Sequence, residues 1–410
     1  MRRAPSWFQL RISTSARRSL TPEGDAAGFP PSRSHRAAAL IVGALVLLAA
    51  FVVVVPYLSS ALKQGYSIIS GSTAGLSTVS STMGQSTSTN ESSALTNGSE
   101  NGCSSTVTVQ NLAAPDINNG TADIAYPSDY CTLASYALGL INQDRAANGT
   151  GSVTLDYNRA AQQHADSMLY YGYFSHYDVQ GYKPYMRYSL LGGAGADFEN
   201  VAYYFYSLPH FLSTTSVESA IQALEHSMVY NDSSCCSNGH RYNILDPLHN
   251  KVSIGVAYNG NYVYFDEEFE NVYLNLNFTA TGASAYTPYH VTMKGTEAQT
   301  VTAPNSIYVA YDSPPAAMTP TQLSNGPHEY DPGTLIGGVT PRDFFGECPQ
   351  FSSGTTVCAD TWAFDSTSIN IAFPLQPFIK EYGAGVYTIY LITGASTESA
   401  ITSISVIVPS

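Results

Sequence analysis

Three short motifs follow one another in the middle of this chain: GYFSH at residues 172–176, ENVA at 199–202 and GHRYNIL at 239–245. They place two histidines and one glutamate, His176, Glu199 and His240, in a fixed order. Imidazole nitrogens and a carboxylate oxygen can together bind a ligand or an ion. We therefore predict that the fold brings these side chains, distant in the sequence, around one shared cleft.

The segments around these motifs predict helices first and strands afterwards. Apolar residues recur at helical spacing in 133–141, 160–168 and 217–228. Residues 252–269 are instead rich in valine, tyrosine and phenylalanine, which favour strands. Helices followed by strands are typical of an α+β domain built from packed layers.

In this order and spacing the motifs resemble the CAP superfamily (SCP/Tpx-1/Ag5/PR-1), and most closely its prokaryotic branch. Further matching residues are Leu138, Ile141, Asn142, Arg145 and the run Ile254-Gly255-Val256. The resemblance covers residues 130–275, about a third of the chain. It implies an α-β-α sandwich, which agrees with the layered domain predicted above.

In CAP proteins two histidines and two glutamates converge in a cleft that can hold a divalent metal. The resemblance assigns three of them to His176, Glu199 and His240, a donor set that suits Zn²⁺ or a similar ion. The alternative for His176 and Glu199 is a purely structural role, in which their hydrogen bonds tie down loops. Asn200 is interpreted as structural, and Arg241 and Asn243 as anchors of the third motif.

The fourth family position departs from the pattern. If Leu224 replaces the family's tryptophan, Ser227 stands where the second glutamate belongs. Glu225 and His226 are additional candidates for this position. One helical step rotates a side chain by about 100°, so the sequence alone does not show that either takes the place of the glutamate. An insertion at residues 230–238 then leads into the third motif and carries two adjacent cysteines.

The leading functional hypothesis is a cleft that binds a ligand, either a metal ion or a lipid-like molecule, in cell-surface interaction or defence. Residue patterns of zinc proteases, serine-hydrolase elbows and phosphate-binding loops are not found in the sequence. A hydrolase of peptides or envelope polymer, metal-assisted or using Ser175 and a histidine, is the enzymatic alternative. A purely adhesive surface protein is the third.

The N-terminal part predicts a membrane anchor. Residues 37–55 are apolar and uncharged, which gives a helix of about 28 Å, close to the thickness of a bilayer core. Residues 1–36 carry seven arginines against Glu23 and Asp25, which favours a cytoplasmic N-terminus. We predict a basic tail at 1–36, a single-pass transmembrane helix at 37–58 and extracellular domains beyond it. A cleaved signal peptide is the alternative.

The part beyond the predicted anchor is acidic, in a chain of net charge −14, and this argues against nucleic-acid partners. The acidic balance also suggests an acidic environment, where protonation weakens histidine ligation of metals. All six cysteines fall here: Cys103, Cys131, Cys235, Cys236, Cys348 and Cys358. We predict disulfides, with Cys348 bonded to Cys358, and with Cys235 and Cys236 bonded to separate partners such as Cys131 and Cys103. A zinc site is the alternative, but no Cys-x-x-Cys spacing supports it.

Three segments follow the anchor. Residues 59–125 are rich in serine and threonine and predict a disordered stalk, and residues 126–279 are the predicted CAP domain. Residues 280–410 contain short strand-like runs between proline and glycine clusters, which predict an all-β sandwich of immunoglobulin-like type. Glycosylation sequons occur at Asn90, Asn97, Asn119, Asn148, Asn231 and Asn277.

Overall fold

The computed structural model describes residues 127–207, 212–282, 289–326, 329–351, 353–393 and 400–409. All of them belong to one of the two compact units of the chain. The predicted basic tail, membrane helix and stalk lie outside the described residues, as does Cys103. Within these ranges, no helix has the length and apolar character needed to span a bilayer.

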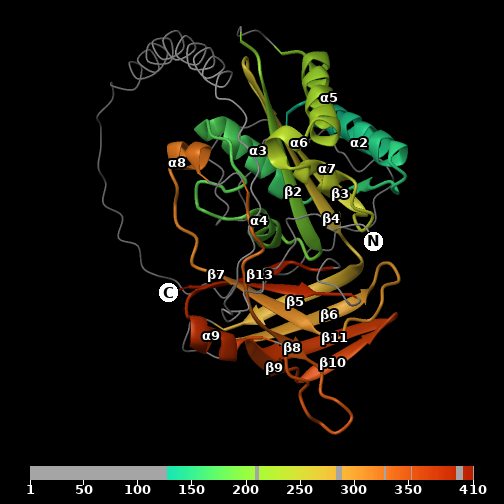
Figure 1. Cartoon of the computed structure of the whole chain (residues 1–410), viewed down its shortest axis with the longest axis vertical. Helices are drawn as coiled ribbons and strands as arrows, with labels where there is room; N and C mark the ends of the chain where they lie inside the picture. The colour runs from blue at the N-terminus through green and yellow to red at the C-terminus, as the bar shows by residue number, and fades with distance from the viewer. Residues whose placement is uncertain are drawn as a thin grey trace, which may run out of the picture. The chain divides into compact units, whose positions relative to one another are not determined.

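A four-stranded sheet forms the centre of the first part of the chain (Figure 1). Its strands, in spatial order, are β1 (Thr154–Leu155), β3 (Lys251–Tyr258), β4 (Tyr262–Asn271) and β2 (Ala196–Phe205). β4 pairs antiparallel with both β3 and β2, whereas the short β1 runs parallel to β3. The central position therefore belongs to β3 and β4, the segment that the sequence predicted to form strands.

Helices cover both faces of this sheet and give the predicted α+β layers (Figure 1). α2 (Tyr130–Ala147) and α5 (Thr214–Tyr230) share an apolar core with Val252, Val256 and Phe265 of the sheet. α3 (Ala160–Tyr171) packs on the other face with a separate apolar cluster. Three short helices were not predicted: α4 (Pro184–Leu190), α6 (Ser233–Cys236) and α7 (Gly239–Ile244).

Two motif glycines do what a residue with a side chain could not do without strain: one turns the chain and one allows a close approach. Gly172 adopts φ 69°, ends α3 and turns the chain toward His176. Gly255 in β3 lies directly under α3, where an added Cβ would come within 2.2 Å of the backbone oxygen of Ala161. The helix can therefore pack this close to the sheet only over a residue without a side chain.

We expect Gly255→Ala to destabilise the protein by about 2–3 kcal/mol, because α3 must move away from the sheet. Gly139→Ala is the matched control, since Gly139 is an exposed residue of α2 with open space around its Cα. That change should stabilise by about 0.5–1 kcal/mol. Chemical denaturation of both variants measures the difference, and equal effects would contradict the close packing of α3.

The second part of the chain is built of two sheets, one with the order β10-β11-β6-β5 and one with the order β13-β12-β7-β8-β9. Its strands are β5 (Leu274–Thr281), β6 (His290–Glu297), β7 (Ile307–Asp312), β8 (Thr334–Thr340), β9 (Thr355–Cys358), β10 (Thr361–Asp365), β11 (Ser368–Pro374), β12 (Gly385–Leu391) and β13 (Ile404–Val408). Side chains of both sheets form one apolar core. The β-rich architecture is confirmed, and its immunoglobulin-like type stays a prediction.

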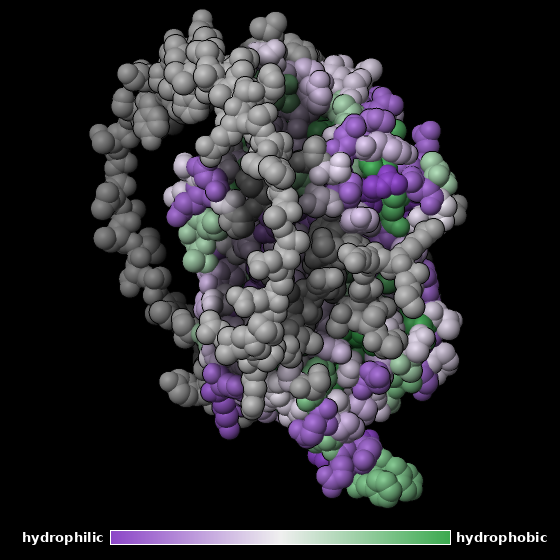
Figure 2. Space-filling view, viewed as in Figure 1, coloured by the Kyte–Doolittle hydropathy of each residue, from purple (hydrophilic) through white to green (hydrophobic). Residues whose placement is uncertain are grey.

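Three features of this part were not foreseen. Two short helices, α8 (Pro320–Asn325) and α9 (Gln376–Tyr382), interrupt the strands. β5 spans the predicted domain boundary at 279/280 and pairs with β6. The loop between β8 and β9 exposes two adjacent aromatic rings, Phe344 and Phe345, and Figure 2 shows hydrophobic surface at the tip of this loop.

Ionic contacts and hydrogen bonds join the second part of the chain to the first part near α4. Lys183 Nζ lies 2.7 Å from Asp312 Oδ1 and 2.9 Å from Asp331 Oδ1. The hydroxyl of Tyr185 donates to Asp312 Oδ2 at 2.7 Å. The β-rich part therefore packs against the region that carries His176 and Glu199.

The disulfides correct one prediction. Cys348 bonds to Cys358, as predicted. Cys235 and Cys236 bond to each other, so the prediction of separate partners was wrong. Their Cα atoms lie 3.8 Å apart within the short helix α6, which keeps the two sulfurs within reach of one another. Cys131 is also in a disulfide.

Candidate functional site

β4 brings an unusual number of acids into the interior. Asp266, Glu267, Glu268 and Glu270 are all fully buried. Because side chains alternate along a strand, Glu267 shares the face of the α2 and α5 core, while the other three lie on the α3 face. The strand character of this segment was predicted from the sequence, but the burial of these acids was not.

The buried acids meet in pairs. The carboxyl group of Glu268 lies against that of Asp197, and the carboxyl group of Glu225 against that of Glu267. The side-chain oxygens of Asp197, Glu225 and Glu268 find no N–H or hydroxyl donor among the described residues. Two carboxylates that lie against each other in a buried site cannot both ionise, because their charges repel. Each pair is therefore expected to hold a shared proton.

Arg187 of α4 supplies the compensating positive charge. Its guanidinium is fully buried, donates from Nη2 to Glu199 Oε2 and lies 3.9 Å from Glu268 Oε1. Burial by itself would raise the pKa of Glu199, but Arg187, with His164 and His176, outweighs it and lowers that pKa to about 2. Glu199 is therefore an ionised carboxylate in the middle of protonated ones.

We expect Arg187→Met to cost about 3–5 kcal/mol of unfolding free energy, since it leaves the Glu199 charge buried without a counter-charge. The double variant Arg187→Met/Glu199→Gln should recover part of this loss, because no charge then remains unpaired. Urea denaturation of both variants near neutral pH measures the effect. A double variant no more stable than Arg187→Met would contradict the pairing.

His176 is held in place by Glu199 and by the β-rich part. Its Nδ1 lies 2.8 Å from Glu199 Oε1, and its ring centre lies 5.0 Å from that of Tyr330. The Tyr330 hydroxyl accepts the backbone N–H of Glu199 at 3.0 Å. An ionised carboxylate can only accept a hydrogen bond, so the neutral ring carries its proton on Nδ1 and donates it to Glu199. Nε2 is then left for a ligand.

His240 is held by a different carboxylate, which was not predicted from the sequence. Its Nδ1 lies 2.7 Å from Oδ1 of the buried Asp232, a residue of the insertion at 230–238. The insertion itself was the signal in the sequence that could have pointed to Asp232. The second oxygen of Asp232 also accepts the backbone N–H of Arg241 at 3.2 Å, which fixes the start of α7 against the insertion.

Hydrogen bonds of the remaining motif residues fasten α7 to the sheet. Asn243 Nδ2 donates to the carbonyl of Phe198 at 3.1 Å and to Asn200 Oδ1 at 3.0 Å. Asn200 Nδ2 donates to Glu267 Oε2 at 3.2 Å. Arg241 Nη1 donates to the carbonyl of Val229 at 2.6 Å. The bonds of Asn243 hold the third motif against β2, and the bond of Arg241 holds it against α5, as a structural role for these residues requires.

One cavity of about 400 Å³ is lined by both histidines. Its other walls are mainly apolar or sulfur-bearing and include Phe174, Val201, Leu224, Met228, Cys235 and Cys236. Ser227, the residue predicted for the fourth family position, also lines it. Glu225 instead points to Glu267, and the exposed His226 packs on Tyr230 with ring centres 4.9 Å apart.

The three predicted site residues share a neighbourhood but not one ligand set. In the described part of the chain, two groups bring three or more possible metal ligands within 4.8 Å of one another: His164 with Glu199 and Asp266, and Asp232 with Cys235, Cys236 and His240. Neither combines His176, Glu199 and His240. Glu199 already bonds His176 and Arg187, so it does not fit as a free ligand for a metal in the cleft.

A serine nucleophile is not assembled in this arrangement. The Oγ of the buried Ser175 accepts the backbone N–H of Tyr177 at 3.1 Å. The nearest histidine contact of this residue is His164 Nε2, which lies 2.8 Å from the carbonyl oxygen and not from Oγ. A general base must reach the hydroxyl that it activates, so these contacts give no support to a Ser/His hydrolase.

The comparison with protein families covers the same region as the site. Residues 138–278 match the family model described as CAP, the Cysteine-rich secretory protein family. This part of the chain is a CAP domain. No curated protein matches the chain. The matched range contains His176, Glu199, His240 and the insertion, whereas most of the β-rich part lies beyond it.

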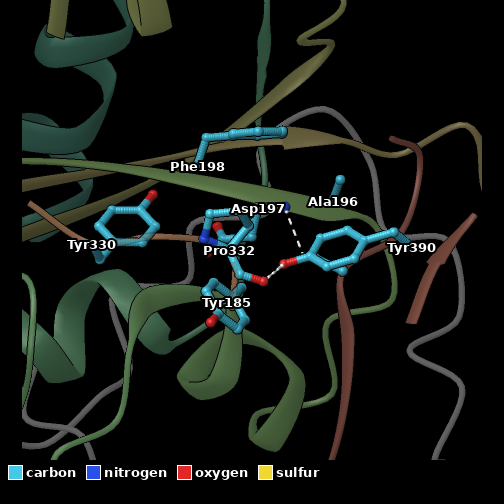
Figure 3. Close-up of a pocket in the computed structure, with 8 residues that line it drawn as sticks. Tyr185, Ala196, Asp197, Phe198, Tyr330, Pro332 and Tyr390 are labelled. Atoms are coloured by element: carbon cyan, nitrogen blue, oxygen red, sulfur yellow. Dashed lines mark hydrogen bonds between the residues drawn. The ribbon is translucent and has the colours of Figure 1, made fainter. Parts of the chain in front are cut away.

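The β-rich part closes the CAP domain over Asp197. A cavity of about 30 Å³, large enough for about one water molecule, lies between Asp197 and three tyrosines, Tyr185, Tyr330 and Tyr390 (Figure 3). The Tyr390 hydroxyl donates to the carbonyl of Pro332 at 2.9 Å. Burial raises the pKa of Asp197 to about 8, so this acid is protonated at neutral pH.

The pKa shifts favour folding in acid. Burial raises the pKa of Asp178 to about 6 and that of Asp166 to about 7. Burial and neighbouring acids also raise the pKa values of Glu225, Asp266, Glu268 and Glu270 far above normal. Stability from such groups is complete below their unfolded pKa of about 4 and is lost as the pH rises toward 8.

Other groups, His164 and Glu199 among them, act in the opposite direction. Burial, with the nearby Arg187, lowers the pKa of His164 to about 3, so the stability from its neutral ring is lost as the pH falls from about 6.5 to 3. The stability from Glu199 is lost between about pH 4.5 and 2. The buried acids with raised pKa values outnumber the groups with lowered ones, which places the expected maximum of stability at mildly acidic pH.

We expect the melting temperature to be higher at about pH 5 than at about pH 8, by at least about 5 °C, since one pKa shift of one unit is worth about 1.4 kcal/mol. Scanning calorimetry across this range measures the difference. Asp197→Asn, which mimics the protonated acid, should reduce it. Equal melting temperatures at both pH values would show that the buried acids do not share protons as inferred.

Proposed function

We propose that the CAP domain binds a small lipid-like molecule in the cavity between His176 and His240. The observation that carries this proposal is the pairing of mainly apolar walls with two imidazoles, each held at Nδ1 by a carboxylate. Ligand sites of this volume commonly combine an apolar lining with a few fixed polar groups. The body of the ligand would pack on Phe174, Leu224 and Met228.

The polar end of the ligand follows from the histidine tautomers. With the protons on Nδ1, the two Nε2 atoms are acceptors, so they favour a hydroxyl or a protonated carboxyl group. A single polar end on an apolar molecule would satisfy one or both of them. A metal held by His176, Glu199 and His240 receives less support, because Arg187 occupies Glu199.

We also propose that the domain acts outside the cell. This rests on the sequence alone: the apolar run at 37–55, the arginines before it and the stalk-like segment after it. The disulfides of the described region suit an oxidising compartment. A membrane-tethered domain would meet its lipid-like ligand at the surface of the cell.

The test is binding of a fluorescent long-chain alcohol to the full-length protein in detergent. His176→Ala/His240→Ala should weaken binding at least about 10-fold, because both acceptors for the hydroxyl are lost. His226→Ala is the matched control, since His226 lies on α5 outside the cavity, and should bind normally. Equal affinity of the double variant and the wild type would exclude this cavity as the binding site.

A further inference from the structure

The bond between Cys235 and Cys236 does little for the stability of the chain. A disulfide stabilises mainly by restricting the unfolded chain, and this effect grows with the length of the closed loop. Cys235 and Cys236 are neighbours, whereas Cys348 and Cys358 are ten positions apart. The adjacent pair also lines the cavity, with Cys235 exposed and Cys236 half-buried. Accessible disulfides are the ones that reductants reach.

The two sulfurs lie beside two further metal-binding side chains. Asp232, Cys235, Cys236 and His240 each offer a ligand atom, and these four atoms lie within 4.8 Å of one another. Asp232 Oδ1 lies 2.7 Å from His240 Nδ1 and 3.6 Å from Cys235 Sγ. All four residues come from one nine-residue segment, so a small movement of the insertion is enough to draw them together.

We propose that reduction of the Cys235–Cys236 disulfide converts this cluster into a binding site for a soft divalent metal ion, with Zn²⁺ as the reference ion. Two thiolates, one imidazole and one carboxylate are a tetrahedral donor set typical of zinc. In the disulfide the sulfur atoms carry no negative charge, so they are weak ligands for a metal ion. The oxidation state of one bond therefore decides whether the metal binds.

The reaction balances with a dithiol as the reductant. One dithiol gives two electrons and two protons to the disulfide, the S–S bond breaks, and the dithiol becomes a cyclic disulfide. Metal binding then displaces the two thiol protons, which pass to solvent. The site is distinct from the proposed lipid contacts in its sulfur ligands, although it shares His240 with them.

The experiment uses the full-length protein and Co²⁺ as a spectroscopic probe, since bound thiolates give it an intense charge-transfer absorption. After treatment with a phosphine, which reduces disulfides, we expect one Co²⁺ per chain with this absorption, displaced by Zn²⁺. The oxidised protein should bind at least about 100-fold more weakly, because it lacks the thiolates. Equal binding before and after reduction would overturn the proposal.

Variants assign the site. Cys235→Ser/Cys236→Ser should abolish the absorption, whereas Cys348→Ser/Cys358→Ser and His176→Ala should retain it. Should the first variant fail to fold, alkylation of the reduced wild type provides the same test. Absorption that survives loss or alkylation of Cys235 and Cys236 would overturn the proposal. Loss of lipid binding without loss of the Co²⁺ signal in His176→Ala separates this inference from the proposed function.

Discussion

Burial of an acid-rich strand between two helical layers is the constraint on which the CAP domain depends. β4 places Asp266, Glu267, Glu268 and Glu270 where water cannot solvate them. A buried charge is tolerated only when it is paired, and a buried carboxyl group otherwise keeps its proton. Arg187 pairs with Glu199, Glu268 faces Asp197, and Glu225 faces Glu267. Glu270 instead accepts hydrogen bonds from the hydroxyls of Tyr188 and Ser253. The interior therefore combines one ion pair with two pairs of facing carboxyl groups, each expected to hold a proton.

This network supports the cleft at its surface. Glu199, which Arg187 keeps ionised, contacts Nδ1 of His176. Asp232, a residue of the insertion, contacts Nδ1 of His240 in the same way. Both residues line one cavity, and in both rings Nδ1 is the nitrogen held by the carboxylate. The β-rich part takes part as well, because Tyr330 bonds the backbone of Glu199 and packs on His176. The site thus depends on contacts across the whole described region.

Local patterns predicted the elements well where the signal is local. The helices at 130–147, 160–171 and 214–230 follow from apolar residues at helical spacing, and β3 and β4 from strand-forming residues. The bond between Cys348 and Cys358 also followed from their closeness in the sequence. The bond between Cys235 and Cys236 did not, because adjacent cysteines can bond to each other only in particular backbone conformations, which the sequence does not reveal.

The sequence by itself determined the family of the central domain, its layers and the histidines that line its cleft, because these are carried by motifs and periodicity. Only the tertiary structure decided what each histidine binds. Asp232, Arg187 and Tyr330 reach the site from an insertion, a short helix and the β-rich part. Such contacts join residues far apart in the chain, and no local pattern encodes which of many carboxylates, cations or aromatic rings will meet a given imidazole.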